Sequence, residues 1–414
     1  MGDTQVRAGE PSVPDALAPP PGNPRFPLFD GLRAVAAMGV LLAHCAVVTI
    51  AATSVAGHVV GDLTMGVTVF FVISGFLLYR PFVAADMAGE RPAPTRVFYR
   101  RRLLRIVPAY WFALTVVALL PGVISVFTSN EWWRYYLLIQ NYSGIDFVFA
   151  RGIGPAWSLS VELAFYLLLP LFAWAMRRAY GGNPDRRVIG DLTVLAALAI
   201  ASTLIRADLI SQINDANGLV SSWKWAVVLT LPLYLTWFAF GMAFASVSAW
   251  STRTGKLPRA LGYAASQPGL VWLFALLCYL LMVIVTPAID AGEQPAHHAM
   301  TAVIAGAVVF PAAFPNPQGR GLPSRFLALP VVAWVGLVSY GLYLWASPLT
   351  LWLVHEGVAS HGPPFLILAA CTLATSIAAA AFSYYVVERP FLRLKYARGR
   401  LPRRTDDSVA RRAA

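Results

Sequence analysis

Long apolar stretches recur along almost the whole of this sequence, and they constrain its fold more than any other feature. A helix needs about 20 mostly apolar residues to cross the hydrocarbon core of a bilayer. Only 13% of the residues are charged and the mean hydropathy is +0.62, which is too apolar for a surface that faces water. We therefore predict an all-α, polytopic membrane bundle of about ten transmembrane helices. The predicted spans cover residues 30–53, 62–84, 106–128, 155–176, 189–210, 226–249, 268–288, 298–315, 330–354 and 364–387.

These spans fall within one predicted transmembrane domain, at residues 25–395. Residues 1–24 are rich in Pro, Gly and Ala and carry few large apolar groups, a composition typical of a disordered tail. Residues 396–414 form a short basic tail. We expect both tails in the cytoplasm and no second folded domain.

Lysine and arginine residues are concentrated in alternate loops. The loops after the second, fourth, sixth and eighth predicted spans, together with the C-terminal tail, hold 24 of the 32 Lys and Arg residues. The positive-inside rule then places both termini in the cytoplasm, with the chain in the plasma or inner membrane. The net charge is +12, and because the charges lie between apolar spans we expect anionic lipid headgroups, not nucleic acid, as their partners. The intervening loops hold only Arg134, Arg151, Arg206 and Lys224.

The first predicted span carries three ionisable residues, Asp30, Arg33 and His44. Such groups are costly at membrane depth, so each is a candidate functional residue. Each helical residue turns by about 100°, so the step from Arg33 to His44 returns to within about 20° of the same face, about 16 Å further along the axis. A neutral imidazole there can act as a general base near neutral pH. The structural alternatives are an Arg33 anchor paired with Asp30 and a His44 that hydrogen-bonds within the bundle.

The remaining histidines and Asp62 are expected to matter less. We place these histidines at the outer ends of spans or in loops, and we interpret Asp62 as a cap of the second span. His44 is then the one histidine inside a predicted span. The others are His58, His297, His298, His355 and His361.

Arg102 and Arg105 lie one helical turn apart, just before the third predicted span. A guanidinium group binds a phosphate through two parallel hydrogen bonds, so this pair is a candidate binding site for a phosphorylated donor. The structural alternative is that both arginines only anchor the helix at the cytoplasmic side of the membrane.

Glu162 lies about one turn inside the fourth predicted span, with Ser158 and Tyr166 on the same helix face. We expect it in the outer half, at a depth near that of His44, so that the two residues share one cavity. The structural alternative is a carboxylate that packs helices with a serine partner. The sequence has no glycine-rich phosphate loop and no cluster of metal ligands, so we expect no metal and no permanently bound cofactor.

Six motifs resemble, in the same order along the chain, those of the acyltransferase-3 family of integral membrane O-acyltransferases. They extend over about residues 25–395, and several motifs in one order are far more specific than any one alone. They read RFPLFDGLR at 25–33 with His44 downstream, GVTVFFVISGFLL at 66–78, RLLRIVPAY at 102–110, WSLSVELAFY at 157–166, SYGLYLW at 339–345 and YVVERP at 385–390.

The resemblance implies an acyltransferase, not of the aminoacyl kind. It would move an acyl group, acetyl being the expected one, from acyl-CoA to a hydroxyl of a sugar, glycan, glycolipid or secondary metabolite. It further implies that His44 and Arg33 are the functional pair and that Arg102 and Arg105 are the paired arginines. The motif residues expected to support the site are Asp30, Ser74, Trp157, Ser158, Tyr166 and Tyr340.

Two positions depart from the pattern of the family. Ala346 stands where a histidine often follows the tyrosine-leucine-tryptophan run, and Thr68 stands where an acidic residue is common. Both departures bear more on the choice of substrate than on the class of reaction.

We combine these observations into one predicted mechanism. Arg33, Arg102 and Arg105 neutralise the phosphates of an acyl-CoA that enters from the cytoplasm. The catalytic group is His44, which deprotonates the acceptor hydroxyl or carries the acyl group itself, while Glu162 orients an imidazole or the acceptor.

Two alternatives from other functional classes remain open. A transporter or flippase would use the polar face of the first span as a permeation path, but no inverted repeat stands out in the sequence. A sensor or assembly protein would need no chemistry, which the intact Arg33, His44 and Glu162 argue against.

Overall fold

The computed structural model describes residues 28–50, 54–120, 122–128, 130–143, 151–215, 222–285, 295–315, 321–358 and 364–394. Within these ranges the chain is helical and contains no strand, which confirms the predicted all-α fold. The tails predicted at 1–24 and 396–414 lie outside the described residues. The long helices are α1 (Leu28–Thr49), α3 (Gly66–Met87), α4 (Thr95–Ala118), α7 (Trp157–Tyr180), α8 (Pro184–Asp215), α10 (Leu235–Thr254), α12 (Pro268–Val285), α13 (Pro295–Ala313), α15 (Pro330–His355) and α16 (Pro364–Ser383).

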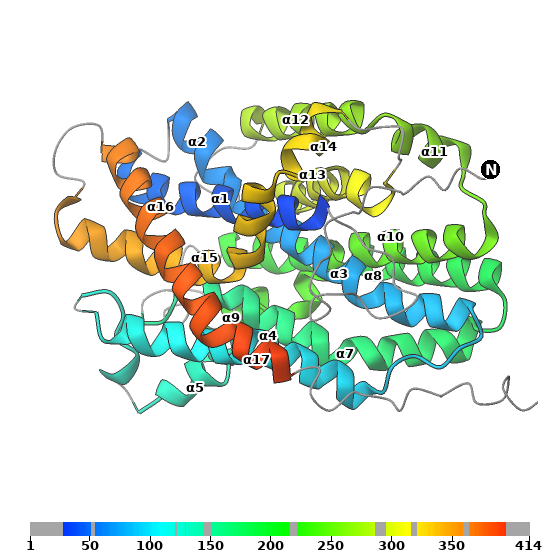
Figure 1. Ribbon diagram of the computed structural model, residues 1–414, viewed down its shortest axis with the longest axis horizontal. Coiled ribbons are helices and arrows are strands. Elements are labelled where there is room, and N and C mark those ends of the chain that lie inside the picture. The colour runs from blue at the N-terminus through cyan, green and yellow to red at the C-terminus, as the bar shows by residue number, and fades with distance from the viewer. Residues whose placement is uncertain are drawn as a thin grey trace, which may run out of the picture.

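Shorter helical segments connect or extend the long ones (Figure 1). Several of them contribute to the site described below, and the last two continue α16 through a π-helical turn into a final helix. They are α2 (Val55–Gly61), η2 (Asp62–Met65), η3 (Val126–Thr128), α5 (Trp132–Tyr136), η4 (Gln140–Ser143), η5 (Gly154–Ala156), α9 (Ser222–Val228), η6 (Leu231–Leu233), α11 (Arg259–Ser266), α14 (Leu322–Leu327), η9 (Tyr384–Glu388) and α17 (Arg389–Leu394).

Proline and glycine explain where several of these helices begin and end. Proline fits the first position of a helix because its missing N–H would have no intrahelical partner there. Glycine can end a helix in the same way that proline can begin one. Helix α10 is followed by Gly255, whose φ of 69° is a left-handed conformation that glycine adopts without strain. The long helices that begin at a proline are α8, α12, α13, α15 and α16.

Eight helical segments are long and apolar enough to cross a membrane by themselves, and the chain is a multi-pass membrane protein. Each contains one of the long helices. Of the ten long helices, only α4 and α10 fall outside this set. The arginines of α4 lower its hydropathy, and α10 contains several Ser, Thr and Trp residues. Both overlap predicted spans and pack inside the bundle, since Tyr110 of α4 and Phe238 of α10 are fully buried.

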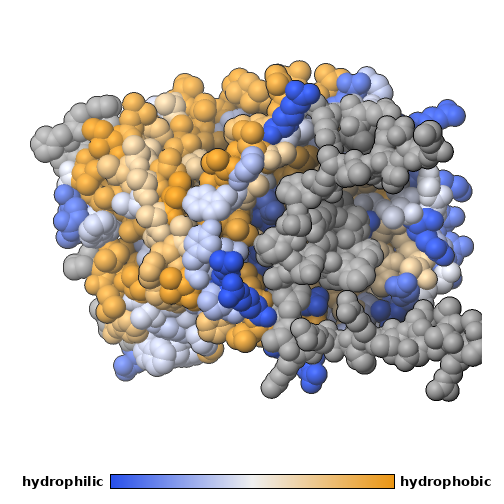
Figure 2. Space-filling view, in the orientation of Figure 1, coloured by the Kyte–Doolittle hydropathy of each residue, from blue (hydrophilic) through white to orange (hydrophobic). Residues whose placement is uncertain are grey.

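The apolar outer surface fits this assignment. In the apolar 18-residue stretch of α12 only 17% of the residues are buried, against 67% in the corresponding stretches of α13 and α15. Helix α12 therefore lies at the periphery of the bundle. Its exposed side chains are large and apolar, which is the composition expected of a surface that faces lipid. Figure 2 shows apolar residues over much of the described surface formed by α12, α15 and α16. The exposed residues of α12 include Leu273, Phe274, Leu276, Leu277, Leu281 and Ile284.

Close helix contacts hold the centre of the bundle in place. A Cβ added at Gly75 of α3 would collide with the carbonyl of Phe238, and one at Gly241 of α10 would collide with that of Val72. The α3 and α10 backbones therefore touch, as small residues allow in membrane bundles. The same argument brings Gly336 of α15 against the carbonyl of Asp30 in α1. These contacts fix α1, α3 and α15, which provide walls of both cavities described next.

Candidate active site

The first cavity, here called the arginine cavity, lies among α1, α3, α4, α7 and α15 and has a volume of about 230 Å³. Three arginines and one carboxylate face it, together with hydroxyl groups and apolar side chains. Its lining consists of Arg33, Val67, Phe70, Phe71, Ser74, Leu77, Leu78, Arg102, Arg105, Ile106, Ser158, Leu159, Glu162, Tyr166, Ser339, Tyr340 and Tyr343.

The carboxylate of Glu162 is fixed by two hydroxyl donors. Ser74 Oγ donates a hydrogen bond of 2.7 Å to Glu162 Oε1, and Tyr166 Oη donates one of 2.6 Å to the same oxygen. Ser74 comes from α3, whereas Glu162 and Tyr166 lie one turn apart on α7. A carboxylate held in this way can orient a cationic neighbour, and Arg102 lies close to both Glu162 and Tyr166.

The three arginines give the cavity a positive character. Arg33 Nη1 lies 3.0 Å from Asp30 Oδ1, one turn earlier on α1, but the Asp30 side chain is half exposed and does not line the cavity. Glu162 is thus the one carboxylate in the lining, against three guanidinium groups. Such a surface favours a ligand with several negative charges, and guanidinium geometry suits phosphates.

The second cavity, here called the histidine cavity, has a volume of about 420 Å³ and lies further along α1. Three histidines, one arginine and several aromatic rings face it. Its lining consists of Val40, His44, Val47, Thr64, Met65, Val67, Thr68, Gly152, Gly154, Pro155, Trp157, Arg206, Tyr234, Trp237, His297, His298, Thr301, Tyr343, Ser347 and Leu351.

Two of these histidines were not expected at the site. His297 Nε2 lies 3.2 Å from Asp62 Oδ1, and this contact joins α13 to η2 across 235 positions of sequence. The His298 ring stacks on Trp237, with centroids 4.4 Å apart and an angle of 21° between the planes. Only 8% of His297 and 1% of His298 is exposed. Both lie in the first turn of α13, at the start of an apolar run. A position at the end of a predicted span does not indicate how deeply a side chain is buried, so the sequence did not single them out.

Arg206 is the one arginine that lines the histidine cavity. It comes from α8, and its guanidinium lies 5.2 Å from the centroid of the Tyr234 ring. The sequence did carry a signal for it, because Arg206 falls inside the span predicted at 189–210, where an ionisable residue indicates function. The prediction instead grouped Arg206 with the charges of the loops between spans, and so did not treat it as a candidate functional residue.

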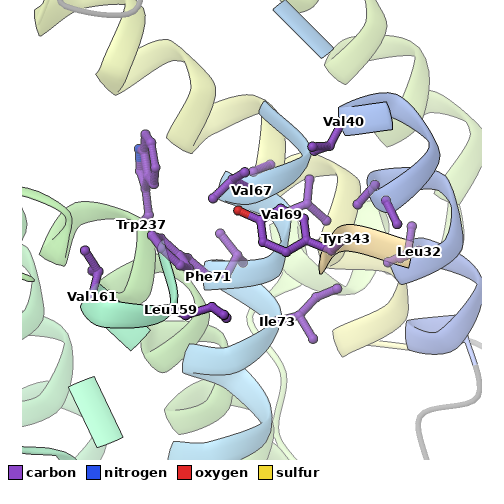
Figure 3. Packing of buried hydrophobic residues seen from close by; sticks show 14 of the residues in the cluster. Leu32, Val40, Val67, Val69, Phe71, Ile73, Leu159, Val161, Trp237 and Tyr343 are labelled. Atoms are coloured by element: carbon purple, nitrogen blue, oxygen red, sulfur yellow. The ribbon is translucent and has the colours of Figure 1, made fainter. Parts of the chain in front are cut away.

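Val67 and Tyr343 line both cavities, and we call these two residues the junction. Figure 3 shows the Tyr343 ring projecting from α15 with its hydroxyl oxygen beside Val67 of α3. That hydroxyl donates a hydrogen bond of 2.8 Å to the Pro155 carbonyl oxygen and lies 2.7 Å from Ser158 Oγ. The Tyr343 ring packs edge-on against Phe70, with centroids 6.0 Å apart. The junction therefore has a defined, hydrogen-bonded conformation at the boundary that the two cavities share.

The structure divides the predicted site residues between the two cavities. The predicted shared face of α1 runs past both, since Arg33 lines the first cavity and His44 the second. Trp157 and Thr68 line the histidine cavity, while Ala346 is buried beside the lining residue Ser347. The predicted residues that line the arginine cavity are Arg33, Ser74, Arg102, Arg105, Ser158, Glu162, Tyr166 and Tyr340.

The expectation that Glu162 and His44 share one cavity is not met. Trp157 is the first residue of α7 and faces the histidine cavity, but Glu162 lies more than one turn further on and faces Arg102. A turn of helix advances only about 5.4 Å, so five residues along α7 are enough to carry the lining from one cavity to the other. Depth counted from the start of a predicted span does not resolve such a difference.

The chain is similar to known proteins over most of its length. The family of the acyltransferase domain matches residues 27–384. Acyltransferase MdmB of Streptomyces mycarofaciens is 27% identical over 406 residues, which cover 91% of this chain and 94% of that protein. Nodulation protein 10 of Rhizobium leguminosarum bv. viciae is 26% identical, covering 89% of this chain and 93% of that protein.

A third relative is longer than this chain. O-acetyltransferase OatA of Staphylococcus aureus is 24% identical over 383 residues, and the match covers 89% of this chain but 57% of OatA. No solved structure is significantly similar to this chain. Because the family match covers most of the chain, including the residues of both cavities, this protein belongs to the acyltransferase-3 family and is an acyltransferase that transfers groups other than amino-acyl groups.

Proposed function

We propose that this protein is an O-acyltransferase that takes an acyl group from acyl-CoA and transfers it to a hydroxyl of a sugar, glycan, glycolipid or secondary metabolite. Acetyl is the acyl group we favour, because one of the relatives is named an O-acetyltransferase. The observation that carries the proposal is the pair of cavities, one cationic and one lined by histidines, that meet at Val67 and Tyr343.

The arginine cavity suits the donor. Coenzyme A carries several phosphate charges, and Arg33, Arg102 and Arg105 offer three guanidinium groups within one cavity. The asymmetry of basic loops supports a cytoplasmic position for the start of α1, which is the end of the bundle where these arginines lie. Acyl-CoA in the cytoplasm of a cell with this protein in its plasma or inner membrane would then reach the cavity directly.

The thioester must reach the junction for transfer to occur. With the phosphates held by the arginines, the flexible arm of the donor extends along α1 toward Tyr343. The hydroxyl groups of Tyr343 and Ser158 lie at this point, and both donate to the Pro155 carbonyl oxygen. When the donor is bound, one of them can turn from that carbonyl to the thioester oxygen and stabilise the negative charge that develops there. Glu162 keeps Arg102 and Tyr166 in position for the donor.

The histidine cavity suits the acceptor. His44 lies in it, within reach of a hydroxyl that enters from the opposite end of the bundle. In a direct transfer the acceptor oxygen bonds to the acyl carbon, the carbon–sulfur bond breaks, and the hydroxyl proton passes to His44 and then to the thiolate. In a two-step transfer the acyl group is first attached to His44.

A transfer assay tests the proposal. Purified protein in lipid nanodiscs is given acetyl-CoA with a labelled acetyl group, alone and with a panel of soluble glycans. We expect release of free coenzyme A and labelled product, and loss of both in a variant that combines Arg102→Gln with Arg105→Gln. Intact acetyl-CoA after prolonged incubation with folded wild-type protein would contradict the proposal and favour the transporter alternative.

A further inference from the structure

Two of the three imidazoles that line the histidine cavity have different surroundings. His297 Nε2 lies 3.2 Å from a carboxylate oxygen of Asp62, and the two side chains are 9% and 15% exposed. His44 is in none of the ion pairs formed among the described residues. Both histidines nevertheless line the same cavity. One imidazole is therefore equipped to hold a positive charge, and the other is not.

The contact with Asp62 fixes the chemistry of His297. A carboxylate is only an acceptor, so the Nε2 position of His297 carries the proton and Nδ1 is left as the ring nitrogen that can take up another. The carboxylate then stabilises the imidazolium that forms, which is the role of the aspartate in a Ser-His-Asp triad. The charge of the pair is also poorly screened, because little of either side chain reaches the surface.

Other groups around His297 do not provide this support. Arg206 on α8 and His298 on α13 are cationic or neutral, and Tyr279 on α12 lies near Asp62 and donates its hydroxyl proton to the Val59 carbonyl. Asp62 is the one carboxylate paired with His297 among the described residues. Of the three imidazoles that line the cavity, His297 is thus the one that a carboxylate contacts among the described residues.

We propose that the catalytic work is divided between the two histidines, with His44 as the acyl carrier and His297, held by Asp62, as the base that activates the acceptor. This inference rests on the proposed function and resolves the role left open for His44. A single histidine cannot accept a proton at the ring nitrogen that carries the acyl group, so a two-step transfer needs a second base, and His297 is placed to supply it.

The proposed transfer has two steps. First, a ring nitrogen of His44 attacks the thioester, its bond to the acyl carbon forms, the carbon–sulfur bond breaks, and the proton displaced from the imidazole leaves with the thiolate of coenzyme A. Second, the acceptor oxygen bonds to the acyl carbon, the nitrogen–carbon bond breaks, and the hydroxyl proton passes to His297 Nδ1. His297 then gives this proton, across the cavity that both histidines line, to the freed nitrogen of His44, which restores both neutral imidazoles.

Self-labelling tests this division without knowledge of the natural acceptor. The full chain in nanodiscs is mixed with acetyl-CoA that carries a labelled acetyl group, and water is the only acceptor. The reaction is quenched at intervals, and protein-bound label and free coenzyme A are measured. In His297→Gln the amide nitrogen can keep the contact with Asp62, but the second ring nitrogen is absent.

We expect the His297→Gln variant to accumulate label, approaching a single acetyl group per chain, while its turnover of acetyl-CoA falls about a hundredfold. The label should map to His44 and be removed by hydroxylamine. His44→Gln should take up no label. As a matched control, His355 also lies near a carboxylate, at 3.7 Å from Glu356, but its side chain is 55% exposed and it lines neither cavity, so His355→Gln should behave as wild type.

Two results would overturn the inference. One is turnover in His297→Gln within twofold of wild type. The other is slow turnover without bound label, which would place His297 before acyl transfer to the enzyme or give it only a structural role. If His297→Gln does not fold, Asp62→Asn removes the charge and keeps a hydrogen-bond acceptor, and it should also slow turnover and raise the bound label. Wild-type protein that never consumes acetyl-CoA would instead contradict the proposed function itself.

Discussion

The arginine cavity and the histidine cavity share two lining residues but differ in what they can do. Guanidinium groups dominate the first, and its single carboxylate is already bonded to Ser74 and Tyr166. Imidazoles and aromatic rings dominate the second. Arginine stays charged and binds anions, whereas histidine gains and loses protons near neutral pH. From this difference we propose that the donor binds on one side of Tyr343 and that proton transfer takes place on the other.

Removal of the imidazole of His44 should have the largest effect on transfer. His44→Ala and His44→Asn should lower transfer by about a hundredfold to ten-thousandfold, because neither side chain can take a proton or carry an acyl group. Binding of coenzyme A should stay close to normal, since His44 does not line the arginine cavity. Turnover and calorimetric binding of coenzyme A are measured on the same samples.

A structural histidine predicts a different pattern. His44→Ala would then lower the yield or melting temperature, and His44→Asn would restore both. Near-native transfer by either folded variant would rule out His44 as the catalytic group.

The junction can be tested through the hydroxyl of Tyr343. Tyr343→Phe keeps the ring that lines both cavities and removes the hydroxyl that is bonded to Ser158 and the Pro155 carbonyl. If this hydroxyl stabilises the thioester oxygen, kcat should fall on the order of a hundredfold while the donor KM changes little. Ser158→Ala leaves the Tyr343–Pro155 hydrogen bond in place and should have a smaller effect. Equal rates in Tyr343→Phe and wild type would show that the ring alone matters at this point.

The variants Arg102→Lys and Arg105→Lys test whether these arginines bind the donor. Lysine keeps the charge but loses the two parallel hydrogen bonds of guanidinium, so the apparent KM for acetyl-CoA should rise about tenfold, with a smaller loss of kcat. Arg253 is an exposed residue in the last turn of α10 and lines neither cavity, so Arg253→Lys is a matched control. A loss of kcat at unchanged KM would contradict a donor-binding role.

The smallest expected effect concerns Glu162. Glu162→Gln keeps the size of the side chain and an oxygen that can accept the hydrogen bonds of Ser74 and Tyr166, but it removes the negative charge next to Arg102. The variant should fold, with an unchanged melting temperature, and transfer should fall several-fold. Wild-type activity would make Glu162 a residue that only packs helices.

Local sequence patterns predicted the all-α fold and several of the residues that line the two cavities. The length of the apolar runs gave the helices, and the helical repeat correctly placed Arg33 and His44 on a common face of α1. Contacts across long sequence separations were out of reach. Ser158 and Tyr343 meet over 185 positions, and Asp62 and His297 over 235. No periodicity within one span indicates which residue of another span lies opposite, so the junction and the second histidine pair required the structure.

A structure of the protein bound to a non-hydrolysable acetyl-CoA analogue, determined by cryo-electron microscopy in nanodiscs, would show where the donor lies. We expect the phosphates of the analogue against Arg33, Arg102 and Arg105, and its acyl end beside Tyr343 and Ser158. The histidine cavity should remain free of the nucleotide. A nucleotide bound among His44, His297 and Arg206, with the arginine cavity unoccupied, would rule out the proposal that the two cavities hold different substrates.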